Sequence, residues 1–579
     1  MRHSKFIRLH LLLILCLITL LSGCGQKVPA SSENIGNTEE GNTNEASSRE
    51  ETEQERKERL KKLTAGNIKL SKQQLATYGC VTDCSFETDQ SHVSLTVSIP
   101  DIPRSDDAYI YLFAFEIYDE EQIFDGKPLT SAEKSTTCRL TWDYQKEQLY
   151  QEFVPALLLN NKYVPIATGS YITNPEVIAE NQDSYPEAAS KKGLLLDPEM
   201  LGTPLLTDLG VQHAIYNIPL SLILGETTDD DYPTIDYDFR GETYQFNGAV
   251  INSYDNLFTY LTNINMISTA IVLNDWNDDF PDLVHPKAKP QKSTAYYYAF
   301  NTSEEAGCRH LEAIASFLTE RYSTGEHGLV SNWIVANEIN QQTIWNYMDT
   351  DDVDYYAQEF EKSLRIFYNA AKSNYANAKV YFSIDHDWNN NNGKNKHHFN
   401  GKDLLAAINH AATQKGNYDW GLAIHPYPNP LSRVNYWAVD YDKTMDAPLL
   451  TLMNLNVVTD FLSQEDYLDR SGNVRSITVT ELGFSSTSGE KLQAAAFAYC
   501  YYIIDANPYI EAFMMNRQTD AIAELKQGLA FGIYEVDHTP KYLFEVFKNI
   551  DTDQAEEYTD LMLNILNAES LEEALSWAQ

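Results

Sequence analysis

The sequence is short of positive charge. Lys and Arg together number 43 whereas Asp and Glu number 83, so the formal net charge is −40. A phosphate backbone or an anionic membrane surface would repel such a chain, which excludes nucleic acid and anionic lipid as its main partners. A neutral polysaccharide or another glycan fits this charge better.

Phosphate-binding loops and zinc motifs are also missing. No glycine-rich loop follows any predicted strand, which weighs against a nucleotide-binding protein. The seven cysteines include no paired Cys/His set, and His386, His397 and His398 lie on an Asn- and Lys-rich stretch without ligand spacing. The sequence therefore predicts neither a metal site nor a cofactor. The motif "CVTDC" at 80–84 leaves open a small disulfide loop or two free thiols.

Long apolar runs are scarce, and the single clear one lies at the N-terminus. Three basic residues precede the stretch from Leu11 to Leu21, and "LSGC" then ends at Cys24. This pattern is typical of an export signal over residues 1–23 and resembles the bacterial lipobox, which implies lipid attachment to Cys24. The alternatives are an ordinary signal peptide or a short membrane helix, although the run is shorter than the roughly 20 residues that span a bilayer. We therefore expect an exported protein, lipid-anchored to the membrane at a bacterial cell surface or envelope.

Composition divides the chain on either side of a large central region. Residues 24–65 are rich in Ser, Asn, Thr and Glu, which is typical of a disordered tether whose charged end could form a short exposed helix. Residues 66–195 alternate short apolar stretches such as "SHVSLTVSI" with turn-rich pieces, which predicts a small β-sandwich. This domain could bind sugar or only pack against its neighbour. Residues 553–579 predict one or two short helices.

In the central region, residues 196–552, strand-like runs alternate with helical periodicity. The eight predicted strands are 211–218, 266–273, 295–300, 333–336, 380–384, 420–424, 476–480 and 510–515. Amphipathic stretches lie between them, for example one whose apolar face comprises Leu311, Ile314, Ala315, Leu318 and Tyr322. Eight such alternations fit an α/β fold of the (β/α)8 type, a TIM barrel, better than an open doubly wound sheet.

Two glutamates follow strands that face each other across such a barrel. Glu338 comes just after the fourth predicted strand, and Glu481 comes just after the seventh. Residues at these positions project into the mouth where barrel enzymes perform their chemistry. Hydrolysis of a glycosidic bond needs one carboxylic acid to protonate the leaving oxygen and one carboxylate to attack or to activate water. Either glutamate alone could equally be a solvated loop carboxylate, but the pair in register predicts a glycosidase site.

Three short motifs extend this pattern. "NE" at 337–338, "HPY" at 425–427 and "TELGF" at 480–484 follow strands four, six and seven. With longer runs such as "RYSTGEHGLVSNWIVANEIN" at 321–340, the stretch of roughly 200–552 resembles clan A glycoside hydrolases. Within them it resembles a bacterial cellulase-like family of largely unassigned function.

The resemblance implies a role for several of these residues. Glu338 would be the general acid/base and Glu481 the nucleophile of a retaining enzyme, and Asn337 would hydrogen-bond the sugar 2-hydroxyl. His425 and Tyr427 would touch the nucleophile or the sugar. A retaining mechanism places the two carboxyl groups about 5 to 5.5 Å apart.

Other residues at the predicted mouth could build sugar subsites. The substrate-binding candidates are Asn217, Trp276, His386, Trp388 and Arg517, and further mouth residues are Trp345, Asp385 and Asn516. Many clan members carry an arginine after strand two and a tryptophan after strand eight, where this chain has "VLNDWND" and "FMMNRQTD". Arg517 could take over one of these functions.

The sequence thus predicts a surface-anchored lipoprotein that hydrolyses O-glycosidic bonds of a polysaccharide or glycan with retention. Two rivals share the predicted anchor. A non-catalytic glycan-binding lipoprotein would keep the barrel as a sugar receptor, and a solute-binding lipoprotein would need two open α/β lobes instead of eight sequential units. Loop shapes set which sugar and linkage such a barrel recognises and whether cleavage is endo or exo.

Overall fold

The computed structural model describes residues 51–288, 293–391 and 393–578. Its contacts divide them into two compact units. The larger comprises the described residues of 175–413 and 417–579, and the smaller comprises residues 51–174 with 414–416. Each unit is described by itself. The predicted signal, Cys24 and most of the predicted tether lie outside the described residues.

The smaller unit contains two antiparallel sheets, as predicted for a β-sandwich. One sheet has the strand order β1-β2-β5 and the other β4-β3-β6-β7. Between them the Trp142 ring from β5 packs against Phe153 from β6, with ring centroids 4.6 Å apart. An exposed helix that begins with a Thr52 capping box precedes the sheets. The elements are α2 (Glu53–Ala65), α3 (Lys72–Leu75), β1 (Cys80–Phe86), β2 (His92–Ser98), β3 (Tyr109–Phe115), β4 (Thr130–Glu133), β5 (Thr137–Asp143), β6 (Glu152–Leu159) and β7 (Lys162–Pro165).

The two cysteines of "CVTDC" lie on strand β1 as free thiols. A bulge between Val81 and Asp83 shifts the register of this strand, so residues four apart no longer share a face. Cys80 is exposed whereas Cys84 is buried, and all five cysteines of the described residues are free. The bulge therefore separates the thiols that a small disulfide loop would join.

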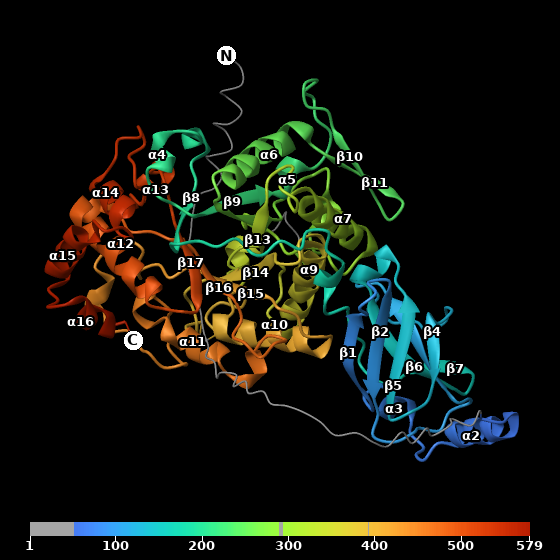
Figure 1. Cartoon of the computed structure of the whole chain (residues 1–579). Helices are drawn as coiled ribbons and strands as arrows, with labels where there is room; N and C mark the ends of the chain where they lie inside the picture. Colours follow the sequence, from blue (N-terminus) through green and yellow to red (C-terminus); the bar gives the residue numbers. More distant parts are fainter. Residues whose placement is uncertain (1–50, 289–292, 392, 579) are drawn as a thin grey trace, which may run out of the picture. The chain divides into compact units, whose positions relative to one another are not determined.

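The larger unit is built on a closed barrel of eight parallel strands, which confirms the predicted fold class. The strands follow one another around the barrel in chain order, and pairing of β17 with β8 closes the ring. In Figure 1 the strands lie in the middle of this unit, with helices such as α6, α9 and α12 around them. The strands are β8 (Lys192–Leu195), β9 (His213–Pro219), β12 (Ile267–Leu273), β13 (Val330–Val335), β14 (Lys379–Ile384), β15 (Gly421–Ile424), β16 (Ile477–Leu482) and β17 (Ile510–Met515).

One of the eight predicted strands is wrong, and one strand of the barrel was not predicted. The segment 295–300 forms only isolated bridges to loop residues after β12 and β13. Tyr298 packs in a loop cluster with Val284 and Ala288, and Tyr297 packs against the barrel core. The missing strand is β8, which lies within the predicted sandwich domain, so the barrel begins before residue 196. Its four residues are too few to show a strand period. The two errors cancel in the numbering, and β13 and β16 remain strands four and seven.

The helices bury the apolar faces that the sequence predicts. Leu311, Ile314, Ala315, Leu318 and Tyr322 are all buried, and a cluster that includes Ile215, Ile271 and Ile334 fills the barrel interior. The remaining strands are β10 (Ile235–Phe239) and β11 (Glu242–Phe246). The helices are α4 (Pro204–Thr207), α5 (Leu220–Ile223), α6 (Gly248–Asn263), α7 (Glu305–Arg321), α8 (Gln342–Trp345), α9 (Val353–Asn374), α10 (Gly401–Gln414), α11 (Asn456–Leu462), α12 (Glu490–Asp505), α13 (Ile522–Leu525), α14 (Tyr542–Asn549), α15 (Ala555–Leu566) and α16 (Leu571–Ser576).

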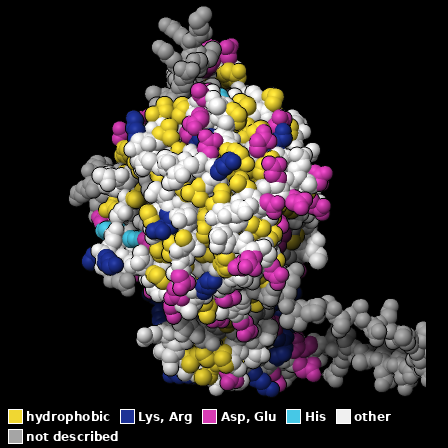
Figure 2. Space-filling view, turned by 90° about the vertical axis from the view of Figure 1, so that its left-hand side faces the viewer, with side chains coloured by type: hydrophobic (Ala, Val, Ile, Leu, Met, Phe, Trp, Pro, Cys, Tyr) yellow, Lys and Arg dark blue, Asp and Glu magenta, His cyan; other side chains and the backbone are white. Residues whose placement is uncertain are grey.

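Acidic side chains spread over the surface that Figure 2 shows, with fewer basic ones among them. This distribution agrees with the net charge of the chain. Across the described ranges, none of the helices has both the length and the apolar character needed to cross a membrane.

Candidate active site

Glu338 lies three residues beyond the end of β13, on a backbone turn of unusual conformation. Ala336 has φ +61° and Glu338 has φ +36°, a left-handed region that disfavours residues with a Cβ and costs on the order of 1–3 kcal/mol. The Glu338 amide donates to Ser383 Oγ at the end of β14 at 2.8 Å. This bond holds the turn, and the Glu338 side chain is fully buried.

Glu481 lies within β16, one residue before its end. Its Oε1 accepts hydrogen bonds from the Tyr427 hydroxyl at 2.9 Å and from Asn516 Nδ2 at 3.1 Å. Asn516 also donates to the Tyr427 oxygen at 2.6 Å. The Glu481 side chain is 25% exposed, whereas the Glu338 side chain is fully buried.

His425 lies between the two glutamates. Its Nδ1 is 2.8 Å from Glu338 Oε1 and 3.8 Å from Glu481 Oε2, and its Nε2 is 3.0 Å from Thr480 Oγ1. Burial lowers the pKa of His425 to about 3, so the ring is neutral. A neutral ring that donates from Nδ1 to Glu338 can accept from the Thr480 hydroxyl at Nε2.

The surroundings set the proton affinity of each glutamate. Burial raises the pKa of Glu338 well above its usual range, and the charges of Asp385 and Glu481 raise it further. A hydrogen bond from Trp345 lowers this pKa, but by less. Burial raises the pKa of Glu481 to about 7, while the Tyr427 hydroxyl and the charge of Arg517 lower it. Glu338 is therefore suited to hold a proton and Glu481 to lose one near neutral pH.

Most of the predicted contact residues lie at this end of the barrel, but they differ in whether they contact a glutamate. The Asn337 side chain accepts from Ser383 Oγ at 3.4 Å. Asn217 is half-buried in β9, the second strand of the barrel and not the first. Arg517 donates to Glu524 Oε1 at 2.8 Å and acts on Glu481 through its charge. Tyr427 is fully buried and contacts the nucleophile candidate Glu481.

Two of the three tryptophans predicted at the mouth are buried. Trp388 is completely buried, donates to the Met445 carbonyl oxygen at 3.0 Å and meets Phe461 edge-on at 5.1 Å, so it packs as a core residue. Trp345 is buried against two tyrosines, with one ring centroid at 5.5 Å. Trp276 packs in a loop cluster and donates to Asp278. An aromatic residue after a strand fills loop cores as readily as it forms a binding surface.

His386 does not contact either glutamate by any hydrogen bond or ion pair among the described residues. Its ring is 3.7 Å from Asp387 Oδ1, and burial lowers its pKa to about 4.

Ser383 and Thr480 are site residues that the sequence reasoning missed. Ser383 orients the Glu338 backbone and Thr480 orients the His425 ring. Thr480 begins the "TELGF" motif, so its place beside Glu481 was a usable signal, whereas Ser383 carries no local signature.

The fold and this site define a (β/α)8-barrel protein with two carboxyl groups brought together from strands four and seven. Residues 184–574 match a family of unknown function, DUF5722. The chain belongs to that family.

Comparison with curated proteins finds no match. Solved structures with similar folds include a family 39 glycoside hydrolase from Bacteroides cellulosilyticus WH2, at 13% identity and a TM-score of 0.42, which covers 77% of this chain and 78% of the other. They also include a β-D-glucuronidase from Dictyoglomus thermophilum, at 12% identity, TM-score 0.34 and coverage of 82% and 68%. An intracellular xylanase from Thermoanaerobacterium saccharolyticum shows 13% identity, TM-score 0.38 and coverage of 63% and 99%. These values are too low to transfer an activity.

Proposed function

We propose that this protein is a retaining glycoside hydrolase in which Glu338 is the general acid/base and Glu481 the nucleophile. The observation that carries the proposal is the position of His425. Its neutral imidazole lies between the two glutamates and contacts the carboxyl group of each. Two carboxyl groups with different proton affinities, one to give a proton and one to act as the carboxylate, are the chemical requirement for glycosidic cleavage.

The distances support retention. The distance from Glu338 Oε1 to Glu481 Oε2 cannot exceed the 2.8 Å and 3.8 Å contacts of His425 Nδ1 laid end to end. Inverting enzymes hold their carboxyl groups roughly 6.5–9.5 Å apart, to leave room for a water molecule between carboxylate and sugar. The upper bound for this pair of oxygens, about 6.6 Å, lies just above the lower end of that range and excludes most of it, which is compatible with direct attack by Glu481.

Each step of the reaction then has a residue. Glu338 gives its proton to the leaving oxygen while the ionised Glu481 carboxylate attacks the sugar carbon and forms a glycosyl-enzyme. Glu338, now ionised, removes a proton from the incoming water that releases the sugar from Glu481. The donors of Tyr427 and Asn516 on Glu481 Oε1 leave Oε2 available for the attack.

The test is hydrolysis of a panel of aryl glycosides and polysaccharides by purified full-length protein. We expect Glu481→Gln to abolish turnover, and Glu338→Gln to lower it by about 10²–10⁴-fold on substrates with poor leaving groups. The loss for Glu338→Gln should be smaller on aryl glycosides with acidic leaving groups, since these need no proton. Glu545→Gln, on α14, is the matched control and should leave the rate unchanged.

The stereochemistry of the first product, followed by NMR, tests retention. Inversion would contradict the nucleophile role of Glu481. If the protein binds a glycan without cleaving it, and both glutamate variants bind equally well, the barrel is a sugar receptor and the proposed hydrolysis is wrong.

We also propose that the protein is exported and lipid-anchored through Cys24 at a bacterial cell surface or envelope. The support is the sequence "LSGC" after a basic and then apolar N-terminus. Cys24→Ser should move the protein from the membrane fraction to the soluble fraction, and mass spectrometry of the parent should find an acylated N-terminal cysteine. If the parent protein is found in the same fraction as Cys24→Ser, the proposed lipid anchor is wrong.

A further inference from the structure

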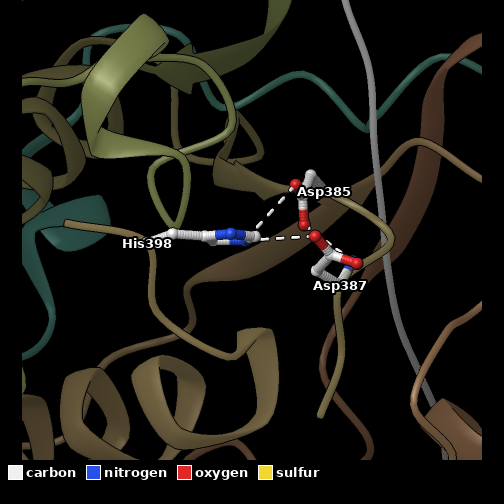
Figure 3. A group of neighbouring side chains, drawn as sticks. All are labelled: Asp385, Asp387 and His398. Atoms are coloured by element: carbon white, nitrogen blue, oxygen red, sulfur yellow. Dashed lines mark hydrogen bonds and ion pairs between the residues drawn. The ribbon is translucent and has the colours of Figure 1, made fainter. Parts of the chain in front are cut away.

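A second group of polar side chains lies beside the glutamate pair. Asp385 follows β14 directly, Asp387 comes two residues later, and His398 belongs to the segment that leads to α10 (Figure 3). One donor atom of each lies within 4.8 Å of the others. His398 Nε2 is 3.7 Å from Asp385 Oδ2 and 3.4 Å from Asp387 Oδ2.

These three atoms converge without bonding to one another. Both distances from His398 Nε2 exceed the 2.7–3.2 Å of an N–H···O hydrogen bond. His398 is 9% exposed, and within the described part of the chain its buried Nε2 has no hydrogen-bond partner. Figure 3 shows the edge of the imidazole aimed at the two carboxylates. A buried nitrogen left in this position needs a cation or a proton between it and the carboxylates.

The carboxylates are held in place by other residues. Asp385 Oδ1 accepts from Asn340 Nδ2 at 2.5 Å and from the Asp387 amide at 2.7 Å, and Gln341 Nε2 donates to Asp385 Oδ2. Asn390 Nδ2 donates to Asp387 Oδ1 at 2.9 Å, which leaves Oδ2 directed at His398. Supporting donors of this kind orient metal ligands in proteins.

The electrostatics of the group favour a bound cation. Asp385 is completely buried, and the Asp387 carboxylate lies beside it. Among the described residues, the ion pairs of these two aspartates are with His386 and His398, and no Lys or Arg side chain reaches them. A divalent ion would supply the missing positive charge.

The donor set selects the kind of ion. An imidazole beside two carboxylates suits Zn²⁺ or Mn²⁺ better than Ca²⁺ or Mg²⁺, which prefer oxygen ligands alone. Metal–ligand bonds of about 2.0–2.2 Å in tetrahedral geometry place donor atoms about 3.4 Å apart. The two His398 distances are close to this value.

We propose that Asp385, Asp387 and His398 bind a divalent transition-metal ion with an open fourth position. The ion would tie the segment after β14 to Asn340 and Gln341, which lie two and three residues after Glu338. It would thereby stabilise the turn that carries Glu338. This inference stands independently of the proposed hydrolysis, because it concerns binding of the ion alone.

The test uses purified full-length protein that has been dialysed against a chelator. Titration calorimetry and elemental analysis should show one Zn²⁺ or Mn²⁺ per chain, and Co²⁺ should bind with the visible absorption of a low-symmetry site. Asp387→Asn and His398→Gln should each weaken binding at least tenfold. The matched controls His397→Gln and Asp403→Asn, which alter neighbours outside the group, should leave the affinity unchanged.

Three results would overturn the proposal: no Zn²⁺ or Mn²⁺ binding to the parent, equal binding in both ligand variants, or equal loss in the controls. In the first case a proton shared within the group takes the place of the metal. Circular dichroism of each variant separates lost binding from lost folding, and His398→Gln keeps the test valid if Asp387→Asn fails to fold. Because the readout is ion binding, failure of the hydrolysis assay would not affect it.

Discussion

Glu338 and Glu481 are the same residue type in two different surroundings. Glu338 is fully buried, next to other negative charges, and has one oxygen on a neutral histidine. Glu481 is partly exposed and accepts from two donors, which favour its ionised form. The surroundings, and not the residue type, assign the acid and the nucleophile roles in the proposed mechanism.

Tyr427→Phe tests the donor to the nucleophile. The Tyr427 hydrogen bond lowers the pKa of Glu481, which is about 7, so its removal raises that pKa. Because the reaction needs ionised Glu481, the acid limb of the kcat/KM profile should move to higher pH by about one unit. The measurement is the pH–rate profile on the substrate that the panel identifies. Tyr499→Phe, whose hydroxyl bonds to the Ala574 carbonyl oxygen, should leave the limb unchanged, and a shift to lower pH would contradict the role of Tyr427.

At the scale of elements, the short strand β8 closes the barrel. Phe513 pairs with Lys192 and Met514 with Gly193, and on its other edge β8 pairs with β9. Without β8 the sheet would have two open edges. The ring that holds strands four and seven opposite each other would then be broken.

Gly193→Ala should weaken this closure. A Cβ at Gly193 would collide with Met514 Sδ and would lie 2.7 Å from the Phe513 carbonyl oxygen. We expect the free energy of unfolding to fall by about 1–3 kcal/mol, as for other overpacked core positions. Calorimetry or denaturant unfolding measures it. Gly401→Ala, where the closest neighbour is a side-chain atom at 3.2 Å, is the control, and equal stability of the two variants would show that the closure tolerates the extra methyl group.

A buried ion pair connects the segment after β17 to the start of α14. Lys541 Nζ lies 2.6 Å from Asp520 Oδ2, and both side chains are almost fully buried. Lys541→Met would leave Asp520 without its cation, so we expect a loss of about 3–5 kcal/mol in unfolding free energy. Lys402→Met, which breaks an exposed pair with Asp446, should cost less than about 1 kcal/mol. Denaturant unfolding of both variants makes the comparison, and similar losses would contradict the importance of burial.

At the scale of the whole molecule, the dominant property is the net charge of −40. Like charges on a folded surface repel one another and destabilise the compact state, and salt screens this repulsion. The charge also favours neutral glycans over anionic partners.

Salt should therefore stabilise the protein. Between about 10 mM and 200 mM NaCl the Debye length falls from roughly 30 Å to below 10 Å, so the Tm should rise by a few degrees. Calorimetry at a series of NaCl concentrations measures this, with an uncharged osmolyte at matched osmolality as the control. A Tm that falls with NaCl would mean that attractive ion pairs outweigh the net repulsion.

The sequence by itself determined the fold class and the catalytic candidates. Apolar periodicity is a local property, and it identified most barrel strands and the helical faces. The two carboxylates at the ends of strands four and seven were predicted from strand order, because parallel strands bring their carboxyl ends to one mouth. Strand β8 was missed and 295–300 was assigned wrongly, since four residues are too few to show a period and aromatic loops imitate strands.

Only the tertiary structure decided what each side chain contacts. Trp388 entered a core, His425 came to lie between two glutamates, and His398 met Asp385 and Asp387 although the sequence showed no ligand spacing. Burial and pKa depend on residues from different strands that meet in space. Their sequence separation carries no signal of that meeting, because closure of the barrel and packing of the loops bring them together.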